Sequence, residues 1–366
     1  MNKTVLFLVF WITIPFLMFA QTSQHFQYEQ ALISNNTRCI SQNIDGSEIW
    51  VGTTEGVSVY NGTNWTNYTT NDNLPHNLIY DIHCASNGDM WVATGSGIAK
   101  FDNGNWTAYT MGDGLPASAI WSITEDTDGN IWGGTSNSGI FKYNGNTFYT
   151  YSTQNGLIDN SVKSIYGDKY GYIWVGTGAG LSRYDGNTFK NYNNTNGLGG
   201  NLVNDILQLS NGSIAVATNG GLSIFNFASW QTLNTSDGLP NNNVLSIAEN
   251  DANVLYIGCA NGLFEYENST TYSLYNIDDG LAETIVSSVL VDKTGSVWAG
   301  APFSGISRYH KNNKTVIFQE NTTIASNNIK HIYKDNNAAI WISTDNGLNS
   351  YENNQWRTYK TAYGIA

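Results

Sequence analysis

The segment NSVKSIYGDKYGYIWVGTGAGLSRY, residues 160–184, contains the pattern that decides the fold of this chain. Its centre recurs along the sequence, usually with an aromatic residue in second place. The eight copies are IWVGT at 49–53, MWVAT at 90–94, IWGGT at 131–135, IWVGT at 173–177, IAVAT at 214–218, LYIGC at 255–259, VWAGA at 297–301 and IWIST at 340–344. Their second residues lie 41 to 43 positions apart, so the chain is a tandem array of one structural unit.

Each unit is predicted to form four short β-strands separated by turns. A first strand ends in a turn such as TDGN at 127–130, which leads into the strand with the Trp. A glycine then marks the turn into a third strand, where a positive φ or close packing favours this residue. These glycines are Gly56, Gly97, Gly139, Gly180, Gly221, Gly262, Gly305 and Gly347. A fourth strand carries aromatic-x-x-Tyr, as in WTNY at 65–68.

A four-stranded unit of about 40 residues cannot bury both of its faces alone, so it must stack on copies of itself. The sequence therefore predicts an all-β fold, a β-propeller of four-stranded blades over residues 38–366, with the repeated aromatic residues as core between blades. Eight copies favour eight blades, and a seven-bladed ring with an extra repeat is the alternative. The first part of a longer array, or a fragment of a longer protein, is also open.

The N-terminal region divides into two parts. Residues 1–20 have the layout of a secretory signal peptide, with Lys3, an apolar stretch and then Ala20. Export to the periplasm, the cell surface or the medium is therefore expected, and an uncleaved membrane anchor is the alternative. Residues 21–37 are a lead-in with a possible closing strand, because HFQY at 25–28 resembles a fourth strand. It would compete with WRTY at 356–359 for the same place in the last blade.

The charge of the chain bears on the class of partner that it can bind, and its cysteines bear on disulfides and metal sites. Lys and Arg number 16 against 29 Asp and Glu, a net charge of −13, which disfavours nucleic acid and anionic membrane surfaces. The three cysteines, Cys39, Cys84 and Cys259, lack metal-type spacing. We expect buried small apolar residues, with a disulfide between two of them as the alternative.

The repeat resembles the two-component regulator propeller repeat of extracytoplasmic sensor regions in bacterial hybrid histidine kinases and related exported propellers. The pattern that carries the resemblance is Asn-x-[Ile/Val]-x-[Ser/Asp]-Ile, then Asp-x-x-Gly-x-Ile-Trp-Val-Gly-Thr and Gly-Leu-x-x-Tyr, and it covers roughly residues 38–361. The resemblance implies a ligand-detecting or scaffolding domain without a kinase output of its own. It also implies an association with complex carbohydrates, or with surface attachment and export in stand-alone relatives.

Catalytic and metal-binding motifs are weak in this sequence. His25, His76, His83, His310 and His331 belong to no recognisable motif, and a structural role is favoured even for His83 and His331, which lie near the predicted channel. The segment DTDGN at 126–130 resembles a calcium loop, but it lacks the later bidentate acid and is expected to be a hairpin turn. We expect no catalytic residue, no metal site and no cofactor.

One position of the repeat varies in chemistry. It lies two residues before an Ile or Val of each first strand, so its side chains are expected to ring one mouth of the channel. The ring consists of Arg38, Tyr80, Trp121, Lys163, Asn204, Leu245, Ser287 and Lys330. Cations, aromatic rings and an amide suit an oligosaccharide or acidic sugar, and unrelated surface residues are the alternative. Three residues earlier, Asn35, Asn77, Asn160, Asn201, Asn242 and Asn327 are expected to shape the linkers.

The sequence therefore favours a sensor-type binding propeller whose partner is an oligosaccharide or similar polymer. A structural or adhesive scaffold that binds an envelope protein is the second hypothesis. A propeller lyase or hydrolase is the third.

Overall fold

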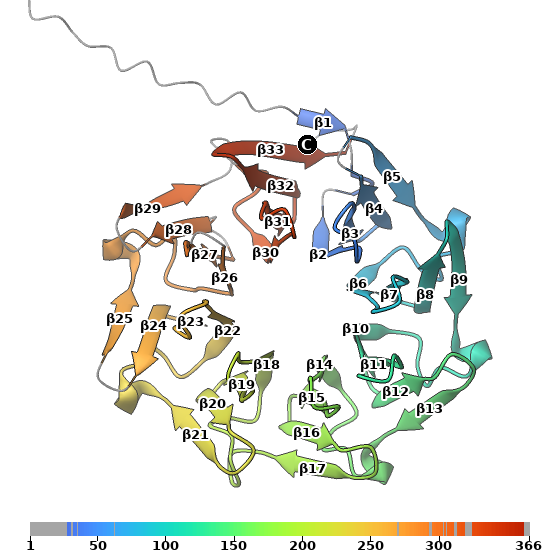
Figure 1. Ribbon diagram of the computed structural model, residues 1–366, viewed down its shortest axis with the longest axis horizontal. Helices are drawn as coiled ribbons and strands as arrows, with labels where there is room; N and C mark the ends of the chain where they lie inside the picture. Colours follow the sequence, from blue (N-terminus) through green and yellow to red (C-terminus); the bar gives the residue numbers. More distant parts are fainter. Residues whose placement is uncertain are drawn as a thin grey trace, which may run out of the picture.

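The computed structural model describes residues 28–361, except 31, 35, 62, 269–270, 293–294, 303, 305, 311–312 and 319–323. The signal-peptide prediction and His25 lie outside the described residues. In the described part, the strands form eight antiparallel sheets of four strands, one of which gains a fifth strand. Figure 1 shows these sheets as blades around a common centre. The predicted β-propeller is confirmed with eight blades, and the seven-bladed alternative is wrong.

The blades follow one another along the chain, and each begins with its innermost strand. The inner strands are β2 (Thr37–Gln42), β6 (Ile79–Cys84), β10 (Ile120–Glu125), β14 (Val162–Gly167), β18 (Val203–Gln208), β22 (Val244–Glu249), β26 (Ser288–Val291) and β30 (Ile329–Lys334). The second strands, which hold the Trp motif, are β3 (Ile49–Thr53), β7 (Met90–Thr94), β11 (Ile131–Thr135), β15 (Ile173–Thr177), β19 (Ile214–Thr218), β23 (Leu255–Cys259), β27 (Val297–Gly300) and β31 (Ile340–Thr344).

The third and fourth strands complete each blade towards the outside. The third strands are β4 (Val57–Tyr60), β8 (Gly97–Asp102), β12 (Ile140–Tyr143), β16 (Leu181–Tyr184), β20 (Gly221–Phe225), β24 (Gly262–Asn268), β28 (Ile306–His310) and β32 (Gly347–Glu352). The fourth strands are β5 (Trp65–Tyr68), β9 (Asn105–Tyr109), β13 (Phe148–Tyr151), β17 (Phe189–Tyr192), β21 (Trp230–Leu233), β25 (Thr271–Tyr275), β29 (Asn313–Phe318) and β33 (Gln355–Lys360). We number the blades 1 to 8 from β2–β5 to β30–β33.

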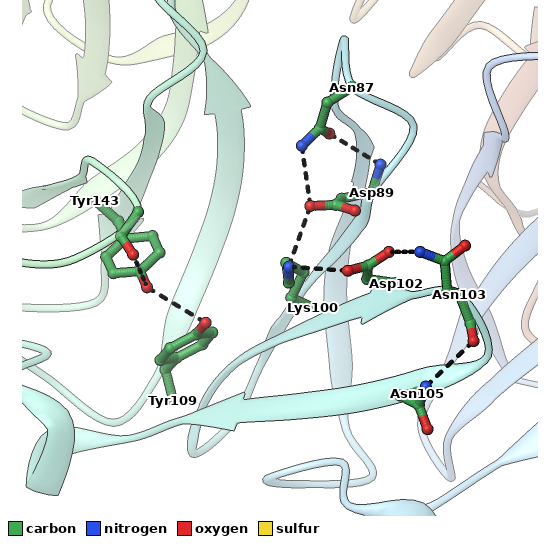
Figure 2. Close-up of polar contacts among 9 residues, drawn as sticks. Asn87, Asp89, Lys100, Asp102, Asn103, Asn105, Tyr109 and Tyr143 are labelled. Carbon is green, nitrogen blue, oxygen red and sulfur yellow. Dashed lines mark hydrogen bonds and ion pairs between the residues drawn. The ribbon is translucent and has the colours of Figure 1, made fainter.

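The repeated aromatic residues fill the spaces between blades. Trp132 of blade 3 is almost fully buried and packs in one cluster with Val162, Ile165 and Tyr184 of blade 4. The ring centroids of Trp132 and Tyr184 lie 5.5 Å apart. Hydroxyl groups also meet across a seam, since Tyr143 of blade 3 donates a hydrogen bond to Tyr109 of blade 2 (Figure 2). Burial of these large rings supplies most of the attraction between blades.

The glycine of the IWVGT motif has a packing cause. A Cβ atom built on Gly176 would lie 2.5 Å from Oγ of Ser164 in its own blade and 2.7 Å from Cγ1 of Val203, the first residue of the next inner strand. At Gly52 it would approach Sγ of Cys39 in its own blade and lie 2.6 Å from Cγ2 of Ile79 in the next. Blades therefore approach so closely at this position that it must hold a small residue.

Recurrent Asp and Asn side chains hold the hairpin turns and the linkers through hydrogen bonds. Asp168 Oδ2 accepts from Trp174 Nε1 at 2.7 Å, while its Oδ1 accepts from two backbone N–H groups of the hairpin. Asp126 holds the DTDGN segment in the same way, which confirms the predicted hairpin turn. The linker prediction is confirmed at Asn77, Asn160, Asn201 and Asn242, whose Oδ1 atoms each accept from a linker N–H at 2.8 Å.

Ring closure uses both ends of the chain. Strand β1 (Tyr28–Gln30) pairs in parallel with the outer side of β33, as Figure 1 shows. The WRTY segment forms the fourth strand and pairs with β32, whereas residues 25–27 of the HFQY segment lie outside the described residues. Near the channel, Thr37 Oγ1 of blade 1 donates to Thr344 O of blade 8 at 2.9 Å.

The three cysteines are free thiols, with Cys39 and Cys259 buried and Cys84 partly exposed. The expected buried thiols are confirmed at the first two positions, and the disulfide alternative is wrong. Burial raises the pKa of Cys259 to about 12. In the part of the chain that the structure describes, no helix has the length and apolarity needed to cross a membrane.

Candidate functional site

The predicted ring residues occupy one structural position, the irregular start of each inner strand. In blades 1 to 6 and in blade 8 the register between the first two strands shifts there, so the ring residue is an inserted one. Ser287 directly precedes β26 and donates its N–H to Gly300 O. A bulge releases a side chain from the regular alternation of the strand and re-aims it.

Three ring residues meet across neighbouring blades. The Arg38 guanidinium lies over the Tyr80 ring, 5.1 Å from its centroid. The Tyr80 ring in turn lies 6.4 Å from that of Trp121, with 52° between their planes. Arg38 is exposed, whereas Tyr80 and Trp121 are partly exposed. These residues form one continuous surface, which we name the Arg38–Trp121 patch.

The other five ring residues do not join this patch through any contact found among the described residues. Asn204 Nδ2 donates to Val244 O at 2.6 Å and so ties blade 5 to blade 6. Ser287 Oγ donates to Gly300 O within its own blade. Leu245 is partly buried, and Lys163 and Lys330 are exposed. The ring is therefore chemically uneven, with its aromatic residues confined to blades 2 and 3, beside Arg38 of blade 1.

A belt of side chains directly below the ring fixes the spacing of the inner strands. Asp81 Oδ2 accepts from Ile123 N at 3.0 Å and from Ser122 Oγ at 3.2 Å, both in the next blade. Asp205 likewise accepts from Ile247 N at 3.0 Å. Burial raises the pKa of Asp81 to about 6 and also raises that of Asp205.

Sequence reasoning missed this belt. Its members follow the ring residues by one position, but nothing in a single repeat shows that a side chain bonds to the next blade. The recurrence of Asp or Ser at this position in six of the eight repeats is the signal that was available.

A second concave surface lies towards the ends of the inner strands of blades 2 to 4. This cavity of about 550 Å³ is lined by Asp81, His83, Ser122, Glu125 and Tyr166, among others. Glu125 is already engaged, because its carboxylate accepts from Ser86 N at 2.7 Å and Ser86 Oγ at 2.9 Å. Ser86 belongs to blade 2, so these bonds also join two blades.

Burial favours the neutral form of the two inner-strand histidines, His83 and His331. Burial lowers the pKa of His83, and it lowers that of His331 to about 4. Among the described residues, His83 Nε2 and His331 Nδ1 have no hydrogen-bond partner. A general base must lie within hydrogen-bond reach of its nucleophile. The structure therefore offers no nucleophile–base pair at these two atoms, and the absence of enzymatic activity stays a prediction.

Comparison with known proteins supports the reading of the repeat. Residues 73–96, 114–137 and 156–179 match the family model described as two component regulator propeller. Each match runs from the end of a linker through the inner strand to the Trp strand of blades 2, 3 and 4. No curated protein sequence gives a match.

Solved structures share the fold at low sequence identity. The extracellular domains of two hybrid two-component systems from B. thetaiotaomicron are similar, with TM-scores of 0.58 and 0.53 and 19% and 20% identity. They cover 93% and 91% of this chain, which covers 55% and 53% of theirs. PorZ, a surface component of the type-IX secretion system of Porphyromonas gingivalis, has a TM-score of 0.57 at 19% identity, with 82% of this chain and 50% of PorZ covered.

This chain thus spans about half the length of those solved chains. The matched segments lie in successive blades of one ring and include the inner strands that carry Tyr80, Trp121 and Lys163. The chain is therefore an eight-bladed β-propeller, and segments of its blades 2, 3 and 4 match the model of the two-component regulator propeller repeat.

Proposed function

We propose that this protein is an extracytoplasmic, sensor-type binding propeller that recognises an oligosaccharide or a similar polymer at the mouth of its channel. The observation that carries this proposal is the Arg38–Trp121 patch, in which a guanidinium and two aromatic rings from three blades form one surface.

The chemistry of the patch fits a saccharide. Aromatic faces stack on the apolar faces of sugar rings, and a guanidinium donates several hydrogen bonds to hydroxyl or carboxylate oxygens. Trp121 and Tyr80 are only partly buried, so part of each ring remains open to a ligand. The belt below the patch, including the bonds from Ile123 N and Ser122 Oγ to Asp81, holds the strands that carry these rings. Such preorganisation lowers the entropy lost on binding.

The sensor role draws support from the shared fold. Similar propellers form extracellular domains of hybrid two-component systems. We propose that this chain is likewise exported and supplies the ligand-detecting part.

A glycan-array screen on purified residues 21–366 tests the proposal. We expect saturable binding that is lost in Trp121→Ala and Tyr80→Ala, because each variant removes a stacking surface. Tyr149→Ala is the matched control, since Tyr149 is an exposed tyrosine on the outer strand β13 and its loss should leave binding unchanged. Equal binding by wild type and both patch variants would place the site elsewhere.

A scaffold that binds an envelope protein is the second candidate, because PorZ is a bacterial surface component with this fold. A well-folded protein that binds no glycan but pulls down one envelope protein would favour this candidate. Product formation at catalytic protein levels would contradict both.

A further inference from the structure

A cavity lies at the seam where blade 8 meets blade 1. Its volume is about 320 Å³, and its walls include Trp341, Ser350, Asp335, Tyr60 and Arg357. These residues come from β31–β33, the turn between β30 and β31, and β4. The cavity combines aromatic rings, the carboxylates of Asp335 and Glu352, hydroxyl groups and the single guanidinium of Arg357.

Other blades show what usually fills this place. In blade 3, Lys142 pairs across the strands with Trp132, and its Nζ lies 5.4 Å from the centroid of the Trp ring. The same Nζ lies 3.5 Å from Asp126 Oδ2, the oxygen that also accepts from Trp132 Nε1. Each of these three groups therefore contacts the other two.

Blade 7 repeats this arrangement with Arg308, whose guanidinium carbon lies 5.2 Å from the Trp298 ring centroid. Its Nη2 lies 3.7 Å from Asp292 Oδ2. In blade 4 the cation is Arg183, 5.8 Å from the Trp174 ring. Blade 2 lacks the equivalent Asp, and there Lys100 pairs with Asp89 and Asp102 instead (Figure 2).

Blade 8 keeps the Trp and the Asp but has no cation at the cross-strand position, and the Arg357 of the cavity wall lies one strand further out, paired with Ser350. The cross-strand partner of Trp341 is Ser350, whose side chain is too short to cover the indole ring. Asp335 Oδ2 accepts from Trp341 Nε1 at 2.9 Å, and Oδ1 accepts from Ala339 N at 2.8 Å. Asp335 is only 7% exposed, and it forms no ion pair with any residue that the structure describes.

We propose that this seam cavity binds the protonated amine or guanidinium of a ligand, which takes the place that Lys142 and Arg308 fill in their own blades. A buried carboxylate gains from a nearby positive charge, and an indole face attracts a cation within about 6 Å. The cavity lies where a lysine-sized side chain stands in blade 3. The site is separate from the Arg38–Trp121 patch and does not depend on the proposed saccharide.

Two sources can supply this chemistry, an amino sugar and a basic amino-acid side chain. Isothermal titration of the whole exported chain with methylguanidinium and n-butylammonium tests the site itself. Glucosamine oligomers and Nα-acetyl-lysine amide then distinguish the sources, and their N-acetylated, uncharged forms are the matched controls. We expect saturable binding of the charged probes and none of the uncharged ones.

Variants of blade 8 and of blade 3 are expected to change the binding of the charged probes in opposite directions. Ser350→Lys supplies an internal cation, so it should abolish binding of the probes and raise the thermal midpoint. Asp335→Asn should weaken binding by about tenfold or more, because it removes the charge that the probe contacts. Lys142→Ser empties the equivalent place in blade 3 and should add a second site of similar affinity.

The proposal is overturned if wild type shows no saturable binding of either charged probe, or if Ser350→Lys binds them as wild type does. Since Ser350→Lys is expected to stabilise the fold, it stays informative even where Asp335→Asn fails to fold. Loss of glycan binding in Trp121→Ala leaves this site unaffected, so the two proposals fail separately.

Discussion

Replacement of Thr37 by valine tests the contact that closes the ring. Thr37 is completely buried in the first strand of blade 1. Its hydroxyl donates to Thr344 O at 2.9 Å, with Gly347 O at 3.3 Å, and accepts from Thr344 N at 2.8 Å. The other blades have only Ile or Val at this position, so Thr37→Val restores the usual residue of the repeat while it removes these bonds.

The magnitude follows from nearly equal side-chain volumes. A buried polar group that loses its partner costs about 1–3 kcal/mol, and a buried methyl group contributes about 0.8 kcal/mol. We expect Thr37→Val to lower the free energy of unfolding by about 2 kcal/mol, with no change in the mouth of the channel. Urea unfolding followed by tryptophan fluorescence measures this as a lower midpoint at an unchanged slope.

Blade 4 provides the reciprocal control. Val162 occupies the same position in an apolar cluster, so Val162→Thr should also destabilise the protein because it buries a hydroxyl there. If Thr37→Val is as stable as the wild type, apolar packing alone closes the ring and the reasoning is refuted.

Three further predictions concern the belt, the motif glycine and a linker. Because the pKa of Asp81 is raised to about 6, its ionised form costs stability above pH 6 and this cost disappears below about pH 4. The free energy of unfolding of Asp81→Asn, relative to that of wild type, should therefore rise by up to about 3 kcal/mol between pH 4 and pH 8 in urea titrations. A difference that does not depend on pH would contradict the raised pKa of Asp81. Gly176→Ala should cost about 1–3 kcal/mol, and Val203→Ala in the same chain should recover part of the lost thermal midpoint, since the added Cβ would lie 2.7 Å from Val203 Cγ1. Asn160→Ala removes the bond from Thr153 N and should cost about 1 kcal/mol and speed proteolysis of this linker, whereas unchanged cleavage would argue against its role.

The sequence predicted the fold because each repeat contains the residues that its own turns and its packing against the neighbouring blades require. The position of Tyr184 is aromatic in all eight units and that of Trp132 in seven, since the seams need large rings, and the position of Asn160 holds Asn in six, since most linkers need the same turn. The candidate ring could be located for the same reason, as one variable position beside constant ones.

The sequence alone did not predict which particular side chains contact one another. Arg38, Tyr80 and Trp121 lie about 41 residues apart in sequence, and only the curvature of the ring brings them together. Asp81 bonds to Ile123 of the next blade for the same reason.

The sequence by itself determined a repeating four-stranded unit and its stacking into blades, and the secretory leader at residues 1–20 stays a prediction. The tertiary structure alone decided how the ends meet, with β1 outside β33 and Thr37 against Thr344. It also decided that a cavity lies beside Trp341, where Ser350 stands at the cross-strand position that a cation occupies in blades 3, 4 and 7. The physical reason is that the residues shared by all repeats determine the packing common to the interfaces between blades. The contacts at one particular interface depend on which side chains of the two neighbouring blades face one another.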